Sequence, residues 1–282
     1  MPGRIPRVTK TEAIVLRHRR LGDADRIVTL LTPTRGKVDV VAKGALRSRS
    51  RMAGHLEPLT RTEVVLAHGR SMDIVTQAQT LDSFTALHTD LDRLSTGMYL
   101  LEATDRLTFE EADLHTVYDL LHAALVRLAR GDGLQLVART FELALLEATG
   151  FLPEWSECLQ CGLPVAAEDA AWSATSGGVF CPNCRGAHAA VPIEPRALRV
   201  LRAFQSQPYE EAARIRLEPE LSGRIERIMN ELMQPVTERE IKTAQFVATA
   251  RRAATRGAEP AAGEDEIAPP DGEGSQPVVG SP

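Results

Sequence analysis

Four cysteines in two close pairs constrain this 282-residue chain more than any other feature. Cys158 and Cys161 form one C-x2-C pair, Cys181 and Cys184 form the next, and 19 residues separate the two pairs. This spacing is typical of structural zinc ribbons, in which each pair aims two thiolates at one point and the two pairs complete a tetrahedron. A closed four-thiolate site has no open coordination position. We therefore expect one structural Zn²⁺ per chain, which supports folding and takes no part in catalysis.

Other uses of the four thiols stay open at this point. The stretch from Met1 to Lys10 has no apolar core and no small-residue cleavage site, so we expect a cytoplasmic chain, which has little use for disulfides. A thioredoxin-like redox pair is disfavoured because no βαβ pattern surrounds either pair. Iron in a rubredoxin-like site would use the same four ligands. His188 lies near enough in sequence to replace one of them, although a lone histidine is more often a surface residue.

The first part of the chain has the pattern of short strands. Five runs rich in Val, Ile and Thr are separated by turns containing Gly or Pro, and they occupy residues 13–16, 26–31, 37–42, 62–66 and 72–78. Five strands in about 70 residues predict a small closed or nearly closed barrel, because closure removes exposed sheet edges. We assign this barrel domain to residues 1–82.

From about Ser83 the apolar residues recur at steps of three and four, which predicts amphipathic helices. The expected apolar stripes are Leu87, Leu91, Leu94, Met98 and Leu101; Val117, Leu120, Leu121, Ala124 and Leu128; and Leu136, Thr140, Leu143 and Leu146. They define a helical domain over 83–150, followed by the cysteine segment over 151–192. Further helices expected at 195–205, 219–233 and 237–250 complete the helical domain over 193–252. The remaining residues, 253–282, are predicted to be a disordered acidic tail. The predicted fold class is α+β, with several domains.

Charge is unevenly distributed along the chain. Residues 1–80 hold fifteen basic and seven acidic side chains, whereas the whole chain has a net charge of −5. A basic end on an acidic protein favours a polyanionic partner, and a solvated basic face is the alternative. Aromatic residues make up only 4%, so we expect contacts to phosphates rather than a base-stacking platform. The candidate nucleic-acid contacts are Arg17, Arg19, Arg20, Arg35, Lys37, Lys43, Arg47, Arg49 and Arg51.

No motif predicts an enzyme. The chain lacks a phosphate-binding G-x-x-x-x-G-K-[ST], a G-x-S-x-G elbow and an H-E-x-x-H pair, and no apolar run is long enough to span a bilayer. Asp23 and Asp25 are interpreted as turn residues, and Glu102 and Asp105 as parts of a solvated helix face. Three functions remain: a non-enzymatic DNA-binding mediator, a protein-interaction scaffold with incidental DNA contact, and an unrecognised metal-dependent nuclease.

Several stretches resemble the RecO family of bacterial recombination mediators. The resemblance rests on residues 11–32, on Gly36-Lys37-Val38 with 41–45, on Ser50 and on Leu56-Glu57-Pro58-Leu59. Further along, Gly150-Phe151-Leu152-Pro153 and Cys158-x-x-Cys161-Gly162 are similar to the family's entry into its zinc segment. The similarity covers about residues 8–247, and the first block and the cysteines are its specific parts.

The resemblance implies a fold and a role that composition and spacing do not. RecO proteins have an N-terminal OB-fold, a central helical domain and, in many members, a zinc-bound segment. They bind single- and double-stranded DNA and anneal complementary strands. With RecR, and in many bacteria with the C-terminal peptide of single-stranded-DNA-binding protein, they help to load RecA at gaps. We therefore expect a DNA repair and recombination mediator that is cytoplasmic and nucleoid-associated, and that is neither an enzyme nor a membrane protein.

Overall fold

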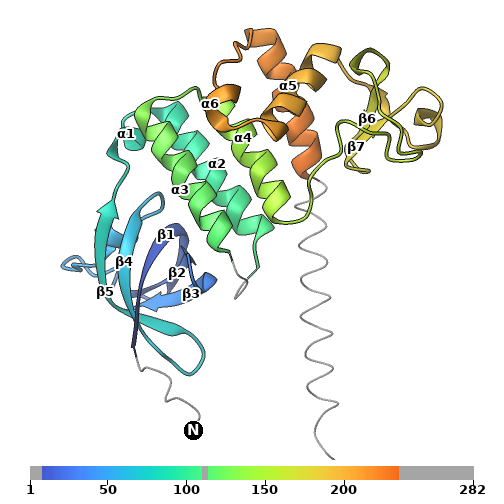
Figure 1. Ribbon diagram of the computed structural model, residues 1–282. Helices are drawn as coiled ribbons and strands as arrows, with labels where there is room; N and C mark the ends of the chain where they lie inside the picture. Colours follow the sequence, from blue (N-terminus) through green and yellow to red (C-terminus); the bar gives the residue numbers. More distant parts are fainter. Residues whose placement is uncertain (1–7, 110–113, 235–282) are drawn as a thin grey trace, which may run out of the picture. The chain divides into compact units, whose positions relative to one another are not determined.

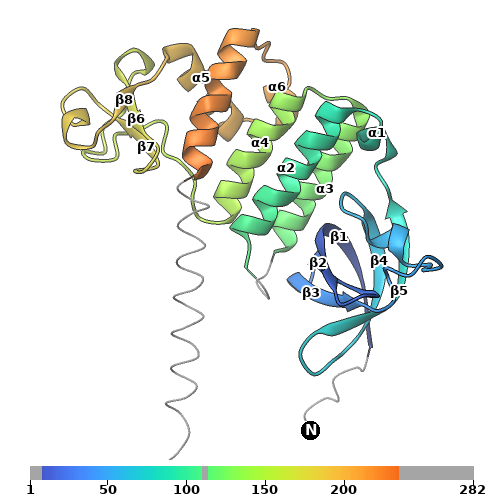
Figure 2. The ribbon, with the colours of Figure 1, turned by 180° about the vertical axis from the view of Figure 1, so that it is seen from behind.

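The structure is a computed structural model that describes residues 8–109 and 114–234. The helix expected at 237–250 and the tail expected at 253–282 lie outside the described residues. Strands come first and helices follow, with a second, small sheet between α4 (Leu134–Ala148) and α5 (Pro195–Ser206), as Figures 1 and 2 show from opposite sides. Within the described ranges, no helix is both long and apolar enough to cross a bilayer.

The N-terminal strands form a closed barrel in the order β1-β2-β3-β5-β4. The strands are β1 (Val8–Leu21), β2 (Asp25–Thr32), β3 (Gly36–Ala42), β4 (Arg61–Ala67) and β5 (Asp73–Asp82). All neighbours pair antiparallel except β3 and β5, which close the barrel in parallel. The 14-residue β1 pairs with β4 through its first half and with β2 through its second, with a register shift between Val15 and Arg17. The expected barrel is confirmed, and five strands in this order are consistent with an OB-fold.

The apolar run at the centre of β1 is buried on both faces, because the barrel also packs against the helices. Ala13 and Val15 lie in the barrel's own core, together with residues such as Val28 and Leu30. Ile14 and Leu16 point the other way and belong to the core of the helices, as do Leu31 and Leu59. A half-buried strand would alternate apolar and polar residues, so the unbroken run indicates burial on two sides.

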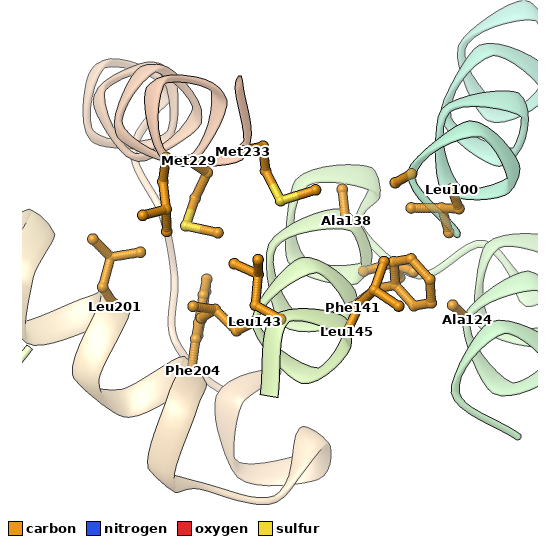
Figure 3. Close-up of a cluster of buried hydrophobic side chains, with 14 of the residues drawn as sticks. Leu100, Ala124, Ala138, Phe141, Leu143, Leu145, Leu201, Phe204, Met229 and Met233 are labelled. Carbon is orange, nitrogen blue, oxygen red and sulfur yellow. The ribbon is translucent and has the colours of Figure 1, made fainter. Parts of the chain in front are cut away.

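The helical part is arranged around α4. Before it come α1 (Thr85–His88), α2 (Leu91–Leu107) and α3 (His115–Arg130); after it come α5, α6 (Tyr209–Ala212) and a helical stretch at 219–234. In Figure 3, side chains of α4 lie between Leu100 and Ala124 on one side and Phe204 and Met229 on the other. The expected helices at 195–205 and 219–233 are confirmed, and so is burial of Val117, Leu121, Ala124 and Leu128 in α3.

The stripe expected for the first helix is confirmed only in part: Leu87 and Leu101 are buried and Leu94 packs against the core, but the other two members are exposed. Leu87 belongs to α1, and Leu91 and Met98 in α2 are 75% and 41% exposed. The side chain of Asp90 accepts hydrogen bonds from the backbone nitrogens of Asp92 and Arg93, which starts a new helix and breaks the register. The buried face of α2 instead includes Gly97, where the Cβ of any larger residue would lie 3.0 Å from Cδ2 of Leu59. The barrel therefore packs where α2 has no side chain, which a hydrophobic pattern does not reveal.

Candidate nucleic-acid interface and metal centre

Four of the nine candidate DNA-contacting residues are paired with carboxylates. The pairs are Arg17 with Asp105, Arg19 with Asp39, Arg35 with Asp73, and Lys37 with Asp105. Three of these contacts have N–O distances of 2.6 to 3.2 Å, and the Arg19 contact is longer at 3.5 Å. Their carboxylate partners already partly neutralise these cations, so each attracts a phosphate more weakly than an unpaired cation does.

Asp105 holds the barrel to the helices. Its carboxylate accepts from Nε of Arg17 in β1 at 2.6 Å and lies 3.2 Å from Nζ of Lys37 in β3, which also donates to the Asp105 carbonyl at 2.5 Å. The side chains of Asp105 and Lys37 are only 19% and 11% exposed. The interpretation of Asp105 as part of a solvated face is therefore wrong. It is the site residue that sequence reasoning missed.

Arg35 is held in a similar way at one end of the barrel. Its guanidinium donates to Asp73 at 2.6 Å, and His68 contacts the other carboxylate oxygen at 3.1 Å. Burial opposes ionisation, but the hydrogen bonds from Arg35 and His68 prevail and lower the pKa of Asp73. A polar cavity of about 270 Å³ lies beside this pair and is also lined by Lys37, Asp39 and the exposed Arg70.

The other five candidates gather at the opposite end of the barrel, and we call them the cationic cluster: Arg20, Lys43, Arg47, Arg49 and Arg51. All five are exposed, and in the described part of the chain none has a side-chain hydrogen bond or ion pair. Arg20 precedes the β1–β2 turn, and Lys43 directly follows β3. The strand register aligns Arg20 with Arg26 and Arg26 with Ala42, so these strand ends are neighbours.

Backbone contacts hold the loop after β3 against the β1–β2 turn. The Gly44 nitrogen donates to Oδ1 of Asp25 at 2.7 Å, and the Leu46 nitrogen donates to the Ala24 carbonyl at 2.9 Å. Gly44 has φ +69°, a left-handed conformation that glycine adopts without strain. Asp25 therefore does not have the local turn role expected of it: it is the first residue of β2 and holds the backbone of a loop 19 residues away. The loop carries Arg47, Arg49 and Arg51 outward from a fixed base.

A second group of ion pairs joins β1 and β2 to Glu57, which lies in the loop before β4. Arg26 donates to Oε1 of Glu57 at 2.7 Å, and His18 contacts Oε2 of the same carboxylate at 3.0 Å. Burial opposes ionisation of Glu57, but the hydrogen bonds from Arg26 and His18 lower its pKa. Because Glu57 binds Arg26 and His18, its carboxylate does not pair with any cation of the cationic cluster. The exposed carboxylate of Asp23, in the β1–β2 turn, offsets part of the cluster's charge.

The four cysteines come together as the sequence predicts. All four thiols are free, and their Sγ atoms lie within 4.8 Å of one another. The Sγ atoms of Cys161 and Cys181 are 3.9 Å apart, close to the ~3.8 Å edge of a tetrahedron with Zn–S bonds of ~2.3 Å. The residues therefore fit one zinc ion. Disulfides are not formed, and among the described residues this is the group of His, Cys, Asp or Glu suited to a metal.

The two cysteine turns have local hydrogen bonds that aim the thiols. The Gly162 nitrogen donates to the Cys158 carbonyl at 2.8 Å, and the Arg185 nitrogen donates to the Cys181 carbonyl at 3.0 Å. Gly162 has φ +72°, as a turn glycine should, whereas Gly186 lies in a 3-10 turn and needs no such freedom. His188 is no ligand: its ring stacks on Phe180 with centroids 4.4 Å apart.

The cysteine segment is anchored to the helices by tryptophan packing. A three-stranded sheet, β6 (Ala171–Ser173), β7 (Gly178–Phe180) and β8 (Val191–Pro192), follows the first cysteine turn. Trp155 is fully buried, and its ring centroid is 6.1 Å from that of Trp172. Arg202 of α5 donates to the Trp155 carbonyl at 2.8 Å. The buried side chains of the segment and of α5 share one core, so the two stabilise each other.

Comparison with known proteins agrees with this architecture. The family model described as "Recombination protein O N terminal" matches residues 7–84, and "Recombination protein O C terminal" matches residues 88–245. A protein of Roseiflexus sp. (strain RS-1) named "DNA repair protein RecO" is 38% identical over 247 residues, 87% of each chain. Its namesake in Dehalococcoides mccartyi (strain CBDB1) is 33% identical over 248 residues, 88% of this chain and 98% of the relative.

A third relative of the same name, from Heliobacterium modesticaldum (strain ATCC 51547 / Ice1), is 35% identical over 256 residues, 88% of this chain and 92% of the relative. The two family models together cover the barrel, the helices and the cysteine segment. The matches extend over both the barrel and the helical part, and the order of the two models along the chain is that of the strands and helices. The chain belongs to the RecO family.

Proposed function

We propose that this protein is a non-enzymatic mediator of DNA repair and homologous recombination. It binds single- and double-stranded DNA through an OB-fold barrel, anneals complementary strands and, with RecR, helps to load RecA at gaps coated by single-stranded-DNA-binding protein. The C-terminal peptide of that protein is a second expected partner. The role requires a cytoplasmic location with access to the nucleoid. Support comes from membership of the RecO family and from relatives named as DNA repair proteins.

The observation that carries the proposal is the cationic cluster. Its five side chains are exposed, unpaired and fixed at one end of a small barrel. Arginine and lysine in such a position bind phosphates and read little sequence. Two DNA strands repel each other through their phosphates. A protein that neutralises phosphates and leaves the base edges free lowers this repulsion, so that complementary bases can pair without any covalent step.

The nine candidate cations have different roles in this proposal. The cationic cluster contacts DNA directly. Arg17 and Lys37 position the barrel against α2 through Asp105, while Arg19 lies next to the cluster as a paired cation and Arg35 is paired at the opposite end of the barrel. Zinc, one ion per chain held by the four cysteines, stabilises the segment between α4 and α5 and supplies no catalytic chemistry.

The proposal is tested by strand annealing and equilibrium DNA binding at several salt concentrations. The variant Arg47→Ala/Arg49→Ala removes two cluster charges, and we expect a roughly tenfold loss of affinity at low salt for every sequence tested. The control Arg130→Ala/Arg216→Ala removes the same charge from exposed positions in the helical part. Equal affinities for the two variants would contradict our choice of surface.

A protein-interaction scaffold is the second candidate function, because α2 exposes the apolar side chains of Leu91 and Met98. A pull-down with purified partners, run beside a gel shift without them, separates the two functions. Partner binding together with absent DNA binding would favour the scaffold. DNA incubated with the protein and Mg²⁺ or Mn²⁺ tests the remaining nuclease hypothesis, and cleavage products would overturn the non-enzymatic proposal.

A further inference from the structure

The polar cavity at the end of the barrel opposite the cationic cluster has no role in the function proposed above. Its volume is about 270 Å³, and its lining comes from the start of β3 and from the turn between β4 and β5. Three cationic side chains line it, namely Arg35, Lys37 and Arg70. The shape of this site distinguishes it as well as its charge, because cations from two separate parts of the barrel border one hollow.

Arg70 supplies the unneutralised charge of this cavity. Its side chain is exposed and has no hydrogen bond or ion pair with any other described residue. The turn that carries it is tight: a Cβ at Gly69 would lie only 2.1 Å from the Met72 carbonyl oxygen, so this position requires glycine. Within the described ranges, the backbone nitrogens of Arg70, Ser71 and Met72 donate no hydrogen bond. The turn therefore presents a cation together with free N–H donors, a combination that suits an anion.

Asp73 holds Arg35 in place beside the same turn. Its Oδ2 accepts a hydrogen bond from Nη1 of Arg35 at 2.6 Å, and its Oδ1 lies 3.1 Å from Nδ1 of His68. The Nε2 of His68 lies 3.1 Å from the hydroxyl of Thr9. A guanidinium has five N–H donors, and the side chain of Arg35 is 33% exposed. The ion pair therefore orients Arg35 and leaves it further donors for an anion in the cavity.

Two carboxylates also line the cavity, but both are already bound by other side chains. Asp73 has the partners just described. Asp39 accepts a hydrogen bond of 2.5 Å from the hydroxyl of Thr29 and lies 3.5 Å from the guanidinium of Arg19. These contacts offset the repulsion that the two carboxylates exert on an entering anion. The attraction comes mainly from Arg70, which no carboxylate neutralises.

The outer face of β3 connects this cavity to the cationic cluster. Val38 and Val40 lie in the barrel core, so the residues that alternate with them face outward. Lys37 near the start of β3 and Lys43 directly after it are six residues apart, about 20 Å along a strand. Arg19 of the neighbouring β1 is 56% exposed and lies between the two ends. At the B-form rise of about 3.4 Å per phosphate, about six nucleotides cover this distance.

We propose that this cavity binds a phosphate group of the same nucleic-acid strand that the cationic cluster holds. The inference rests on the proposed function. Phosphate suits the site because Arg35 offers directed N–H donors and Arg70 offers an unpaired charge. A strand of about six or more nucleotides contacts both ends of the barrel, whereas a shorter strand contacts only one. The protein thereby prefers strands that are long enough to pair stably. A free nucleotide also carries phosphate, and the two measurements below distinguish these sources.

The first measurement uses inorganic pyrophosphate and no DNA. The full chain carries Arg47→Ala/Arg49→Ala/Arg51→Ala, so that the cluster contributes little, and it is titrated by calorimetry at low salt. We expect a Kd of about 1 mM, and a binding at least about fivefold weaker when Arg70→Ala is added. The matched control adds Arg130→Ala instead, which removes the same charge from an exposed position in the helical part. Equal Kd values for the two additions would overturn the inference.

The second measurement follows DNA affinity against strand length, with the cluster intact. Fluorescence anisotropy compares Arg70→Ala with Arg130→Ala on oligothymidylates of about 4 and about 12 nucleotides. We expect Arg70→Ala to weaken binding of the longer strand about fivefold and to make its salt slope shallower by about 0.7, because one phosphate contact is lost. Binding of the shorter strand should change by less than about twofold. An equal effect at both lengths, or no effect on the longer strand, would overturn the inference.

The failure of this inference and the failure of the proposed function are distinguishable. If no strand binds while pyrophosphate still requires Arg70, the cavity is a phosphate site, and the proposed function is overturned together with the strand as its ligand. If Arg70→Ala weakens pyrophosphate binding and affects neither strand, the ligand is a free phosphate compound, and the shared strand is overturned. If strands bind and neither measurement responds to Arg70→Ala, the inference is overturned and the DNA-binding function stands.

Discussion

At the scale of single residues, whether a cation is available to bind DNA phosphates depends more on its ion-pair partner than on its position in the sequence. Arg17 and Lys37 are near the cationic cluster in sequence, yet both are held by Asp105. The sequence alone could not separate the paired cations from the unpaired cations of the cluster, because partners such as Arg17 and Asp105 are 88 residues apart in the chain. Only the folded chain decides which cations are neutralised.

Asp105 should therefore stabilise the chain. Replacing it (Asp105→Asn) leaves the largely buried ammonium of Lys37 without its carboxylate, so we expect the free energy of unfolding to fall by about 1–3 kcal/mol. The control is Glu102→Gln in the same helix, where Glu102 is 59% exposed and pairs with Arg106. That change should cost less than about 0.5 kcal/mol. Urea unfolding measures both, and equal losses would contradict the role of Asp105.

A second residue-scale prediction concerns the buried carboxylate of Glu142 in α4. It is fully buried, lies 3.2 Å from Arg139 and accepts a hydrogen bond of 2.5 Å from Tyr99. Burial raises the pKa of Glu142 to about 7, although Arg139 and Tyr99 act in the opposite direction. The folded state thus keeps a proton that the unfolded state releases near pH 4.5. Stability from this group is present at low pH and is lost as the pH rises toward 7.

The matching variant is Glu142→Gln, which cannot titrate. Relative to this variant, the free energy of unfolding of the wild type should fall by about 2–3 kcal/mol between pH 5 and pH 8. Denaturant unfolding at the two pH values gives the difference directly. If the wild type and the variant change in parallel with pH, Glu142 does not titrate as described.

At the scale of elements, hydrophobic periodicity predicted the strands and helices whose positions are determined by the local sequence. The five strands and the helices at 195–205 and 219–233 were found where their patterns placed them. The stripe expected for α2 was only partly right, because the Asp90 side chain caps a new helix start locally and because a tertiary contact, the packing of Leu59 on Gly97, selects the buried face. The cysteine cluster was predictable, because metal-ligand spacing is a local property of the chain.

Tryptophan fluorescence can report on the structure of the cysteine segment. The chain contains two tryptophans, Trp155 and Trp172, and both are buried in this segment. Removing zinc by chelation, or the change Cys181→Ser, should expose them and shift tryptophan emission to the red. Far-UV circular dichroism should change little, because few residues of β6–β8 contribute to it. Restored emission upon stoichiometric zinc is the control, and unchanged emission after zinc loss would contradict a structural metal site.

At the scale of the whole molecule, the barrel has a core of its own and also contributes side chains to the core of the helices, while the excess of basic residues is on the barrel. Ile14, Leu16, Leu31 and Leu59 from the barrel side are buried with the helices. The barrel end that carries the cationic cluster is left exposed. This division gives a rigid support for a basic surface, which is what binding by charge neutralisation requires.

The account's central claim is that the cationic cluster neutralises DNA phosphates. The most direct measurement is the dependence of log K on log salt for a single-stranded oligonucleotide. Each phosphate contact contributes a slope of about −0.7, so Arg47→Ala/Arg49→Ala/Arg51→Ala should make the slope shallower by about 2. Lower affinity with this shallower slope is the predicted result. An unchanged slope and affinity, or no DNA binding by the wild type at low salt, would contradict the account.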